Sequence, residues 1–282
     1  MIRLQGPSPR SSHVWQGDYN PPIRTSAPSS WTRCTSPLAK VVPLVTHKHA
    51  ARIAFATGMI GLGAVGLVFG DFAQVWHSAP KWVPGRQVLA YASAALIVVC
   101  GVGLLSKRTV LAASRVLLCF WALAVLLIEV PVVVKHPLVE GAWQGLAHLT
   151  MLLVAAWMLF TANDRVGRIA RVLFGLALIP VGLAHFVYLE LTAPIVPAWL
   201  PYHTFWAYFT GAAQIAAAAG LVLGIYARLA AGLETVLLAA FTFLVWPPLL
   251  HASPTKAGLW SEFAASWALT AAAWVVAAYM AD

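Results

Sequence analysis

The sequence predicts an all-α, polytopic membrane protein whose eight transmembrane helices form two parallel four-helix repeats. The chain of 282 residues is 61% hydrophobic and only 10% charged, whereas about a quarter of the residues of a soluble domain are charged. Apolar runs of about 20 residues, which cross a hydrocarbon core of roughly 30 Å as helices, recur along the chain. The third observation is an internal repeat.

The repeat has a constant offset of 117 residues, which relates Pro80 to Pro197 and Trp82 to Trp199. A match at one fixed period is the signature of a duplicated structural unit. The same offset relates Pro84 to Pro201, Tyr91 to Tyr208, Gly103 to Gly220, Trp143 to Trp260, Leu152 to Leu269, and Ala155-Ala156-Trp157 to Ala272-Ala273-Trp274. The chain is therefore expected to be two copies of one unit.

Each unit is expected to hold four spans. The first span is rich in glycine, which is typical of helices that approach closely in lipid. Pro131 lies near the end of the third span, where neighbouring helices can tolerate a proline. The expected spans are 53–70, 87–106, 110–134 and 142–161 in the first unit, and 169–189, 204–226, 229–250 and 259–280 in the second.

Domain boundaries follow from the composition. Residues 1–49 are expected to form a disordered basic tail, because they are rich in Pro, Ser, Thr and Arg and lack a long apolar core. The same lack argues against a cleavable signal peptide. The two units are assigned to residues 50–162 and 163–282, with a polar connection at 163–168.

The distribution of Lys and Arg predicts the topology. Fourteen of these residues lie in the tail and in the loops on its side of the membrane, against four in the opposite loops. Basic residues accumulate on the cytoplasmic side, so both termini are expected to be cytoplasmic, in the inner (plasma) membrane. An even number of helices per unit gives both units the same orientation, related by a pseudo-twofold axis along the membrane normal. The partner implied by the net charge of +9 is then the lipid bilayer and not nucleic acid.

Two residue classes are assigned structural roles. The three cysteines, Cys34, Cys100 and Cys119, form no C-x-x-C motif, so they indicate neither a dithiol redox motif nor a zinc knuckle, and no residue is assigned as a metal ligand. Tryptophans gather near the outer ends of the spans, where an indole keeps its ring in the interface and its N–H in water. The expected interfacial anchors are Trp82, Trp143, Trp199, Trp206 and Trp260.

The repeat does not extend to the ionisable residues: Glu129 corresponds to Trp246, and His148 to Ala265. Ionisable groups at membrane depth are costly, so each suggests a function. His148 and His185 are expected at similar depth, both lining the interior. The candidate polar site near the outer face comprises Glu129, His148, His185, Glu190, His251 and Glu262.

Several ligands suit such a layer. A quinone headgroup, a metal ion or a haem held by two imidazoles would all fit, no spacing motif selects among them, and we disfavour haem. Alternatively, the histidines bridge helices through hydrogen bonds. Glu234 is expected to pair with Arg228 or to extend towards water, and Gln214 to join two helices.

Two segments, Arg171-Val-Leu-Phe-Gly175 and Gly182-Leu-Ala-His185-Phe186, followed by a Pro-containing outer segment and a span with Gly220, resemble the DoxX-like membrane proteins. The resemblance covers residues 169–280 and, through the repeat, 52–161 more loosely. It implies four-helix units and carries over no catalytic residue. A few members of that family are associated with membrane redox complexes, including the small subunit of a thiosulfate:quinone oxidoreductase.

The function expected from this resemblance is that of an accessory or anchoring subunit of a quinone-linked membrane redox system, with a redox protein as partner and no enzymatic activity of its own. Two alternatives remain. One is a small-molecule transporter, since parallel repeats suit alternating access, although no span shows the paired interruptions of a midplane site. The other is a purely structural membrane protein.

Overall fold

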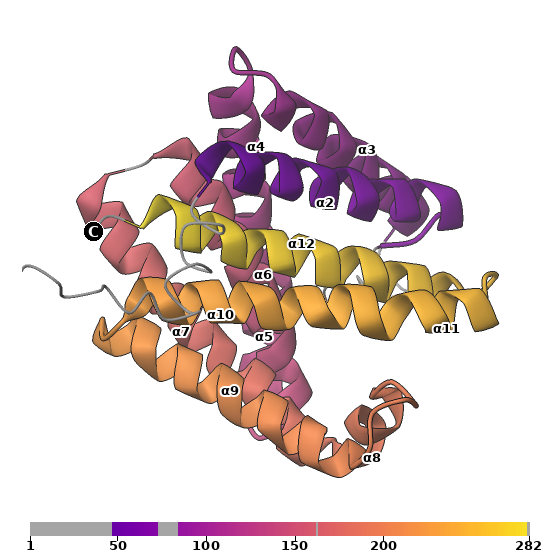
Figure 1. Cartoon of the computed structure of the whole chain (residues 1–282). Helices are drawn as coiled ribbons and strands as arrows, with labels where there is room; N and C mark the ends of the chain where they lie inside the picture. The colour runs from indigo at the N-terminus through magenta and orange to yellow at the C-terminus, as the bar shows by residue number, and fades with distance from the viewer. Residues whose placement is uncertain (1–46, 73–83, 162, 281–282) are drawn as a thin grey trace, which may run out of the picture. The chain divides into compact units, whose positions relative to one another are not determined.

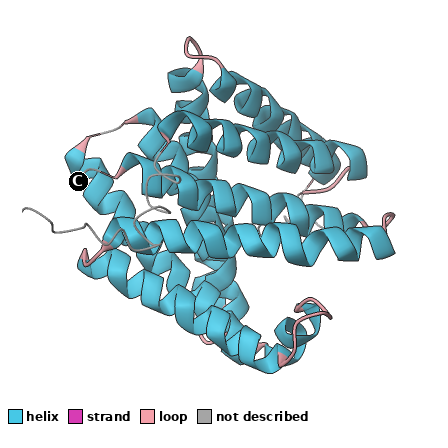
Figure 2. Cartoon of the chain, viewed as in Figure 1, coloured by secondary structure: helices cyan, strands magenta, loops and turns pink. Residues whose placement is uncertain are grey.

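The computed structural model describes residues 47–72, 84–161 and 163–280, and within these ranges the chain forms helices and short connections with no strand (Figure 2). Eight helices are long and apolar enough to cross a membrane. This confirms the all-α, polytopic prediction. Residues 1–46 of the predicted tail, Trp82 and Cys34 lie outside the described residues. Lys48 and His49, which were assigned to the disordered tail, instead begin the first described helix.

The helices carry the labels of Figure 1. Six spans are single helices: α2 (Lys48–Phe69), α3 (Arg86–Leu105), α6 (Glu140–Phe160), α7 (Asp164–Val187), α9 (His203–Leu223) and α12 (Ala257–Tyr279). Two spans are composite: α4 (Val110–Ala124) continues through a π-helical turn (Val125–Glu129) into α5 (Val130–Lys135), and α10 (Ala227–Ala240) continues through another (Phe241–Val245) into α11 (Trp246–Ala252). A short helix, α8 (Leu189–Thr192), and a 3₁₀ turn (Ala193–Ile195) lie between α7 and α9.

The predicted polar connection at 163–168 is mostly helix. Asn163 adopts an extended backbone conformation and its side-chain oxygen accepts a hydrogen bond from the Val166 amide at 2.9 Å. This cap satisfies an amide that the first helical turn leaves without a partner. Helix α7 therefore begins at Asp164, five residues before the predicted start of the span.

The two π-helical turns occupy corresponding places in the third and seventh spans. Pro131 and Pro247 follow these turns within the first residues of α5 and α11. Proline has no amide hydrogen and its ring crowds the preceding turn, so the helix adjusts its hydrogen bonding locally. The sequence-based spans ran through these positions without interruption.

The first helix of each repeat packs against the last helix of the other repeat. Thus α2 contacts α12, and α7 contacts α6. Since α6 and α12 also contact each other, they form a seam shared by two rings of helices. The first ring comprises α2, α3, α4, α6 and α12, and the second ring comprises α7, α9, α10, α12 and α6. Figure 1 shows α12 between α2 and α10.

Contacts within the two repeats also correspond at the offset of 117. Trp143 Nε1 donates to the Pro137 carbonyl at 2.9 Å, and Trp260 Nε1 donates to the Pro254 carbonyl at 2.8 Å. In both repeats an indole N–H thus forms the same hydrogen bond to the short connection before the last span. The similarity of sequence is accompanied by a similarity of local packing.

The alternating spans place their ends on two faces. We call the face with the start of α2, the start of α7 and the end of α12 the basic face. Described cations on it are Lys48, Arg52, Lys107, Arg108, Arg115, Arg165, Arg168, Arg171 and Arg228, whereas those near the opposite ends are Arg86, Lys135 and Lys256.

Candidate functional site

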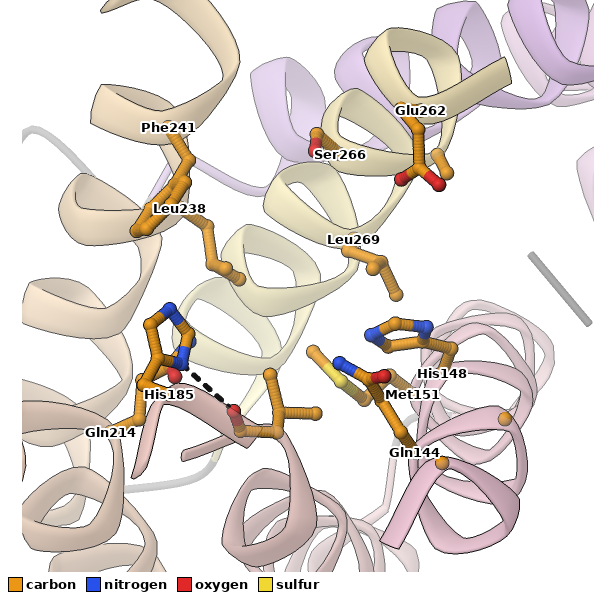
Figure 3. A pocket seen from close by; sticks show the side chains of 14 residues that line it. Gln144, His148, Met151, His185, Gln214, Leu238, Phe241, Glu262, Ser266 and Leu269 are labelled. Atoms are coloured by element: carbon orange, nitrogen blue, oxygen red, sulfur yellow. Dashed lines mark hydrogen bonds between the residues drawn. The ribbon is translucent and has the colours of Figure 1, made fainter. Parts of the chain in front are cut away.

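A cavity of about 360 Å³ lies in the second ring, with walls from α6, α7, α9, α10 and α12. Its polar lining residues are Gln144, His148, His185, Gln214, Glu262 and Ser266. Figure 3 shows His148 and Gln144 entering from one side and His185 and Phe241 from the other. The remaining walls are apolar and include Met151, Val181, Leu238 and Leu269.

Helical spacing explains why these side chains share one space. On α6, Gly141, Gln144, His148 and Met151 follow one another at intervals of three or four residues. Residues at such intervals lie on one helix face. On α12, Glu262 and Ser266 are likewise four residues apart, so the seam helices present one polar face each to the cavity.

His185 is oriented by its own helix. Its Nδ1 lies 3.1 Å from the Val181 carbonyl oxygen. A carbonyl oxygen can only accept, so Nδ1 carries the proton and Nε2 of the neutral ring is an acceptor. The imidazole also meets the Phe241 ring edge-to-face, with centroids 5.7 Å apart.

His148 and Glu262 are available to a ligand. Both side chains are half-buried, and neither has a hydrogen-bond partner among the residues that the structure describes. A polar group away from bulk water costs free energy when it makes no hydrogen bond. The cavity thus holds an imidazole and a carboxyl group that a polar ligand would satisfy.

Gln214 connects the cavity to a second buried acid. Its amide Nε2 lies 3.5 Å from Oε1 of Glu234, and both side chains are 1% exposed. The expected pairing of Glu234 with Arg228 is wrong: Arg228 Nη2 donates to the Met280 carbonyl at 2.8 Å. Glu234 is turned into the bundle, where the Gln214 amide is its hydrogen-bond partner among the described residues, because α9 and α10 pack closely.

The structure brings together three of the six predicted site residues: His148, His185 and Glu262. Glu129 is fully buried but belongs to the π-helical turn of the first repeat and does not line the cavity. Glu190 and His251 are exposed near the ends of their spans, outside the lining.

Four of the predicted tryptophan anchors lie in the described residues. Trp143, Trp199 and Trp260 are exposed, while Trp206 is half-buried and donates to the Pro201 carbonyl at 3.0 Å.

Sequence reasoning missed Gln144 and Ser266 as cavity residues, and treated Gln214 only as a link between helices. A signal existed for two of them. Gln144 lies four residues before His148 and Ser266 four residues after Glu262, so each shares a helix face with a residue already singled out. For Gln214 no such neighbour exists on α9.

An apolar cavity of about 170 Å³ adjoins the first one and shares His185 and Phe241 with it. Its walls come from the segment after α8 and from α9 and α10, and include Leu200, Phe209 and Leu244. A ligand with a polar head and an apolar tail would find both environments side by side, with the His185–Phe241 contact between them.

Three positions of the first ring that correspond to cavity residues of the second carry apolar side chains. Val68 stands in place of His185, and Ile97 in place of Gln214. Trp121 stands in place of Leu238 and is among the largest fully buried side chains. We infer that the indole fills the space that remains open in the second ring.

Within the described ranges, no three or more His, Cys, Asp or Glu side chains lie close enough together to share a metal ion. What the cavity offers instead is hydrogen bonding and proton exchange at imidazole and carboxyl groups, between apolar walls.

Comparison with known proteins adds one finding. A family model described as a domain of unknown function (DUF8561) matches residues 174–277. This segment runs from α7 into α12 and includes His185, Gln214 and Glu262, whereas His148 precedes it. Neither the curated proteins nor the solved structures gave a match.

Proposed function

We propose that this chain binds a quinone and serves as an accessory or anchoring subunit of a quinone-linked membrane redox system. The observation that carries the proposal is the pairing of two cavities around His185. One is polar, with His148 and His185 on opposite sides (Figure 3), and the other is apolar and adjoins it.

The polar cavity suits a quinone headgroup. Such a headgroup is a flat ring with an oxygen at each end, which accepts a hydrogen bond as a carbonyl in the quinone and can donate one as a hydroxyl in the quinol. His148 and Gln144 can donate to one end, and Nε2 of His185, on the opposite side, can accept from a quinol hydroxyl at the other end. Phe241 and Leu269 offer apolar contact to the ring face. A volume of about 360 Å³ is in the range of small-molecule sites.

The apolar cavity suits the start of an isoprenoid tail. Its walls are formed almost wholly by aliphatic and aromatic side chains of α9 and α10 and the segment before α9. Burial of such a tail contributes about 25 cal/mol per Å² of apolar surface. This second environment favours a quinone over a wholly polar transported solute.

The chain would also accept and return the protons of the quinone reaction. Oxidation of a quinol to a quinone releases two electrons and two protons, and the electrons would pass to an electron carrier of the redox partner. His185 Nε2 can accept one proton and an ionised Glu262 the other. In the direction of reduction the same groups return them.

Binding of a short-tail quinone, and of its quinol, to the purified protein tests the proposal. We expect quenching of tryptophan fluorescence that saturates. The affinity for the quinone should be about tenfold lower in His148→Ala, which loses a donor, and the affinity for the quinol about tenfold lower in His185→Ala, which loses an acceptor, because each loses one hydrogen bond of about 1–1.5 kcal/mol. His251→Ala is the matched control, since it removes an exposed histidine outside the cavity. Lipid extracts of the wild-type protein should contain quinone.

Two results would count against quinone binding: saturable quenching of equal affinity in the wild type and in the double variant, or no saturable binding to a wild type that is folded by circular dichroism. Loss of binding in His251→Ala alone would place the ligand elsewhere.

The same proposal includes the location: the inner membrane, with both termini in the cytoplasm. It is supported by the excess of cations on the basic face. A fluorescent protein that matures only in the cytoplasm, fused after the chain's end, should fluoresce. A fusion in the Pro254–Lys256 connection should not.

A further inference from the structure

A second pocket, distinct from the proposed quinone site, opens on the basic face. It has a volume of about 640 Å³ and lies between the start of α7, the turn that joins α9 to α10, and the end of α12. Three of its lining residues are arginines, Arg168, Arg171 and Arg228, and one is an acid, Asp164. We call it the arginine pocket.

Arg171 is placed by the turn that joins α9 to α10. Gly224 has a φ of 77°, in the left-handed region that favours glycine. A Cβ built on Gly224 would lie 2.5 Å from Nη1 of Arg171, so only a glycine lets the guanidinium lie against this turn.

The arginine pocket retains unused hydrogen-bond donors. Arg228 uses Nη2 on the Met280 carbonyl at 2.8 Å, which fixes it at the end of α12. Arg171 is half-buried, and no acceptor among the described residues bonds it. A guanidinium presents five N–H groups in a planar fork that matches the oxygens of a phosphate.

A long apolar groove leads away from the arginine pocket. It has a volume of about 600 Å³, runs between α9 and α10, and shares Tyr226 and Leu229 with the arginine pocket. Further along it is lined by Leu233, Val236 and Leu237. The phosphate donors are thus continuous with a surface that suits an acyl chain.

The internal repeat shows that a helix start of this kind does not require Arg168 and Arg171. At the offset of 117, the residues that correspond to Arg168, Arg171 and Arg228 are Ala51, Ala54 and Leu111. Arg228 also holds the end of α12, so it is Arg168 and Arg171 that the local fold leaves without a structural explanation.

We propose that the arginine pocket binds the phosphate of an anionic phospholipid, with one acyl chain in the groove between α9 and α10. The pocket is at the level of the helix ends, where headgroups lie. Among the described lining residues, three cations against one acid favour an anionic headgroup over a zwitterionic one, and basic pockets between spans on the cytoplasmic side are the usual sites for such lipids. The continuous apolar groove favours a lipid over a soluble phosphate ester.

Native mass spectrometry of the purified chain, with phosphatidylglycerol or phosphatidylcholine added, tests this. We expect retention of phosphatidylglycerol only, and at least tenfold weaker retention in Arg171→Gln. Arg171→Lys keeps the positive charge but loses the planar fork of N–H donors, so its loss of phosphatidylglycerol retention should be smaller than that of Arg171→Gln. Arg165→Gln is the matched control, because Arg165 is exposed near the start of α7 and does not line the pocket.

Two further measurements, a salt titration and a displacement experiment, use the unaltered protein. Raising NaCl from about 50 to about 500 mM should weaken retention of phosphatidylglycerol, because salt screens exposed charges. Inorganic phosphate and glycerol 3-phosphate should displace the lipid only weakly, since they lack the acyl chain.

Three outcomes would overturn the lipid assignment: equal retention of both lipids, unchanged retention in Arg171→Gln, or tight binding of soluble phosphate with no retained phosphatidylglycerol. The last would make the pocket a site for a soluble phosphate ester. If Arg171→Gln fails to fold, Arg171→Lys and the salt titration decide.

Discussion

At the scale of single residues, Gln214 and Glu234 form a buried polar pair in the second ring, in which each side chain depends on the other for its hydrogen bond. Both side chains are buried, and the first ring holds Ile97 and Leu117 at the corresponding positions. Replacing one member of a buried polar pair leaves the other without a partner, whereas replacing both by apolar groups is nearly neutral.

We therefore expect Gln214→Ile to lower the free energy of unfolding by roughly 1–3 kcal/mol, because Glu234 would remain buried without its amide donor. Adding Glu234→Leu, which transplants the first-ring pair, should recover most of the loss. Denaturant unfolding in mixed micelles, without quinone, measures both. A double variant as unstable as the sum of the two single variants would show that the pair is not coupled.

At the scale of helices, close packing between α2 and α12 depends on Gly58. A Cβ at Gly58 would lie 2.9 Å from Cα of Ala268, whereas a Cβ at Gly61, one turn later, would lie 3.9 Å from the Ala264 Cβ. The first distance forces the helices apart, and the second is an ordinary contact.

This difference provides a matched pair of variants. Gly58→Ala should destabilise the protein by roughly 1–3 kcal/mol through overpacking. Gly61→Ala should be neutral or stabilising by up to about 1 kcal/mol, because alanine is the better helix former. Thermal unfolding in detergent compares the two, and equal midpoints would mean that the α2–α12 contact is looser than described.

Helices are also where the sequence was most informative. Apolar runs located all eight spans, because a span needs a fixed length of apolar side chains. The starts of α2 and α7 were each placed five residues too late, since polar first turns such as Asp164–Arg168 interrupt the apolar run although they are helical. Apart from the nearby prolines, nothing in the sequence indicated the π-helical turns.

The candidate site was predicted only in part, for a related reason. Spacing shows which residues share a face of one helix, and it could have placed Gln144 and Met151 beside His148 on α6. It does not show which neighbour that face meets. Glu129 and Glu262 therefore looked equivalent from the sequence, although the fold buries one in the first repeat and opens the other to the cavity.

At the scale of the whole helical unit, the exchange of first helices between the repeats has a consequence for assembly. The first helix of each repeat packs against the second helix of its own repeat and also against the last helix of the other repeat, so neither half alone covers both contact faces of its first helix. We expect residues 47–161 and 163–280, produced separately, to be unstable as monomers and to co-purify when produced together. Affinity capture with a tag on one half measures this.

The two halves would instead be independent if either one purified alone as a monodisperse monomer with the helix content of the intact protein. A half that survives alone should be a homodimer, because the contact between α2 and α12 would then be made by the first and last helices of two copies.

The buried indole of Trp121 bears on how many ligands one chain can bind. A symmetric dimer of single four-helix units would carry two equivalent binding sites, and a mutation in either would appear in both. Because the two halves form one chain, they need not be alike: the first carries Trp121 and Ile97 where the second has Leu238 and Gln214 around an open space. Titration should accordingly end at one quinone per chain, half the number that the duplicated architecture suggests.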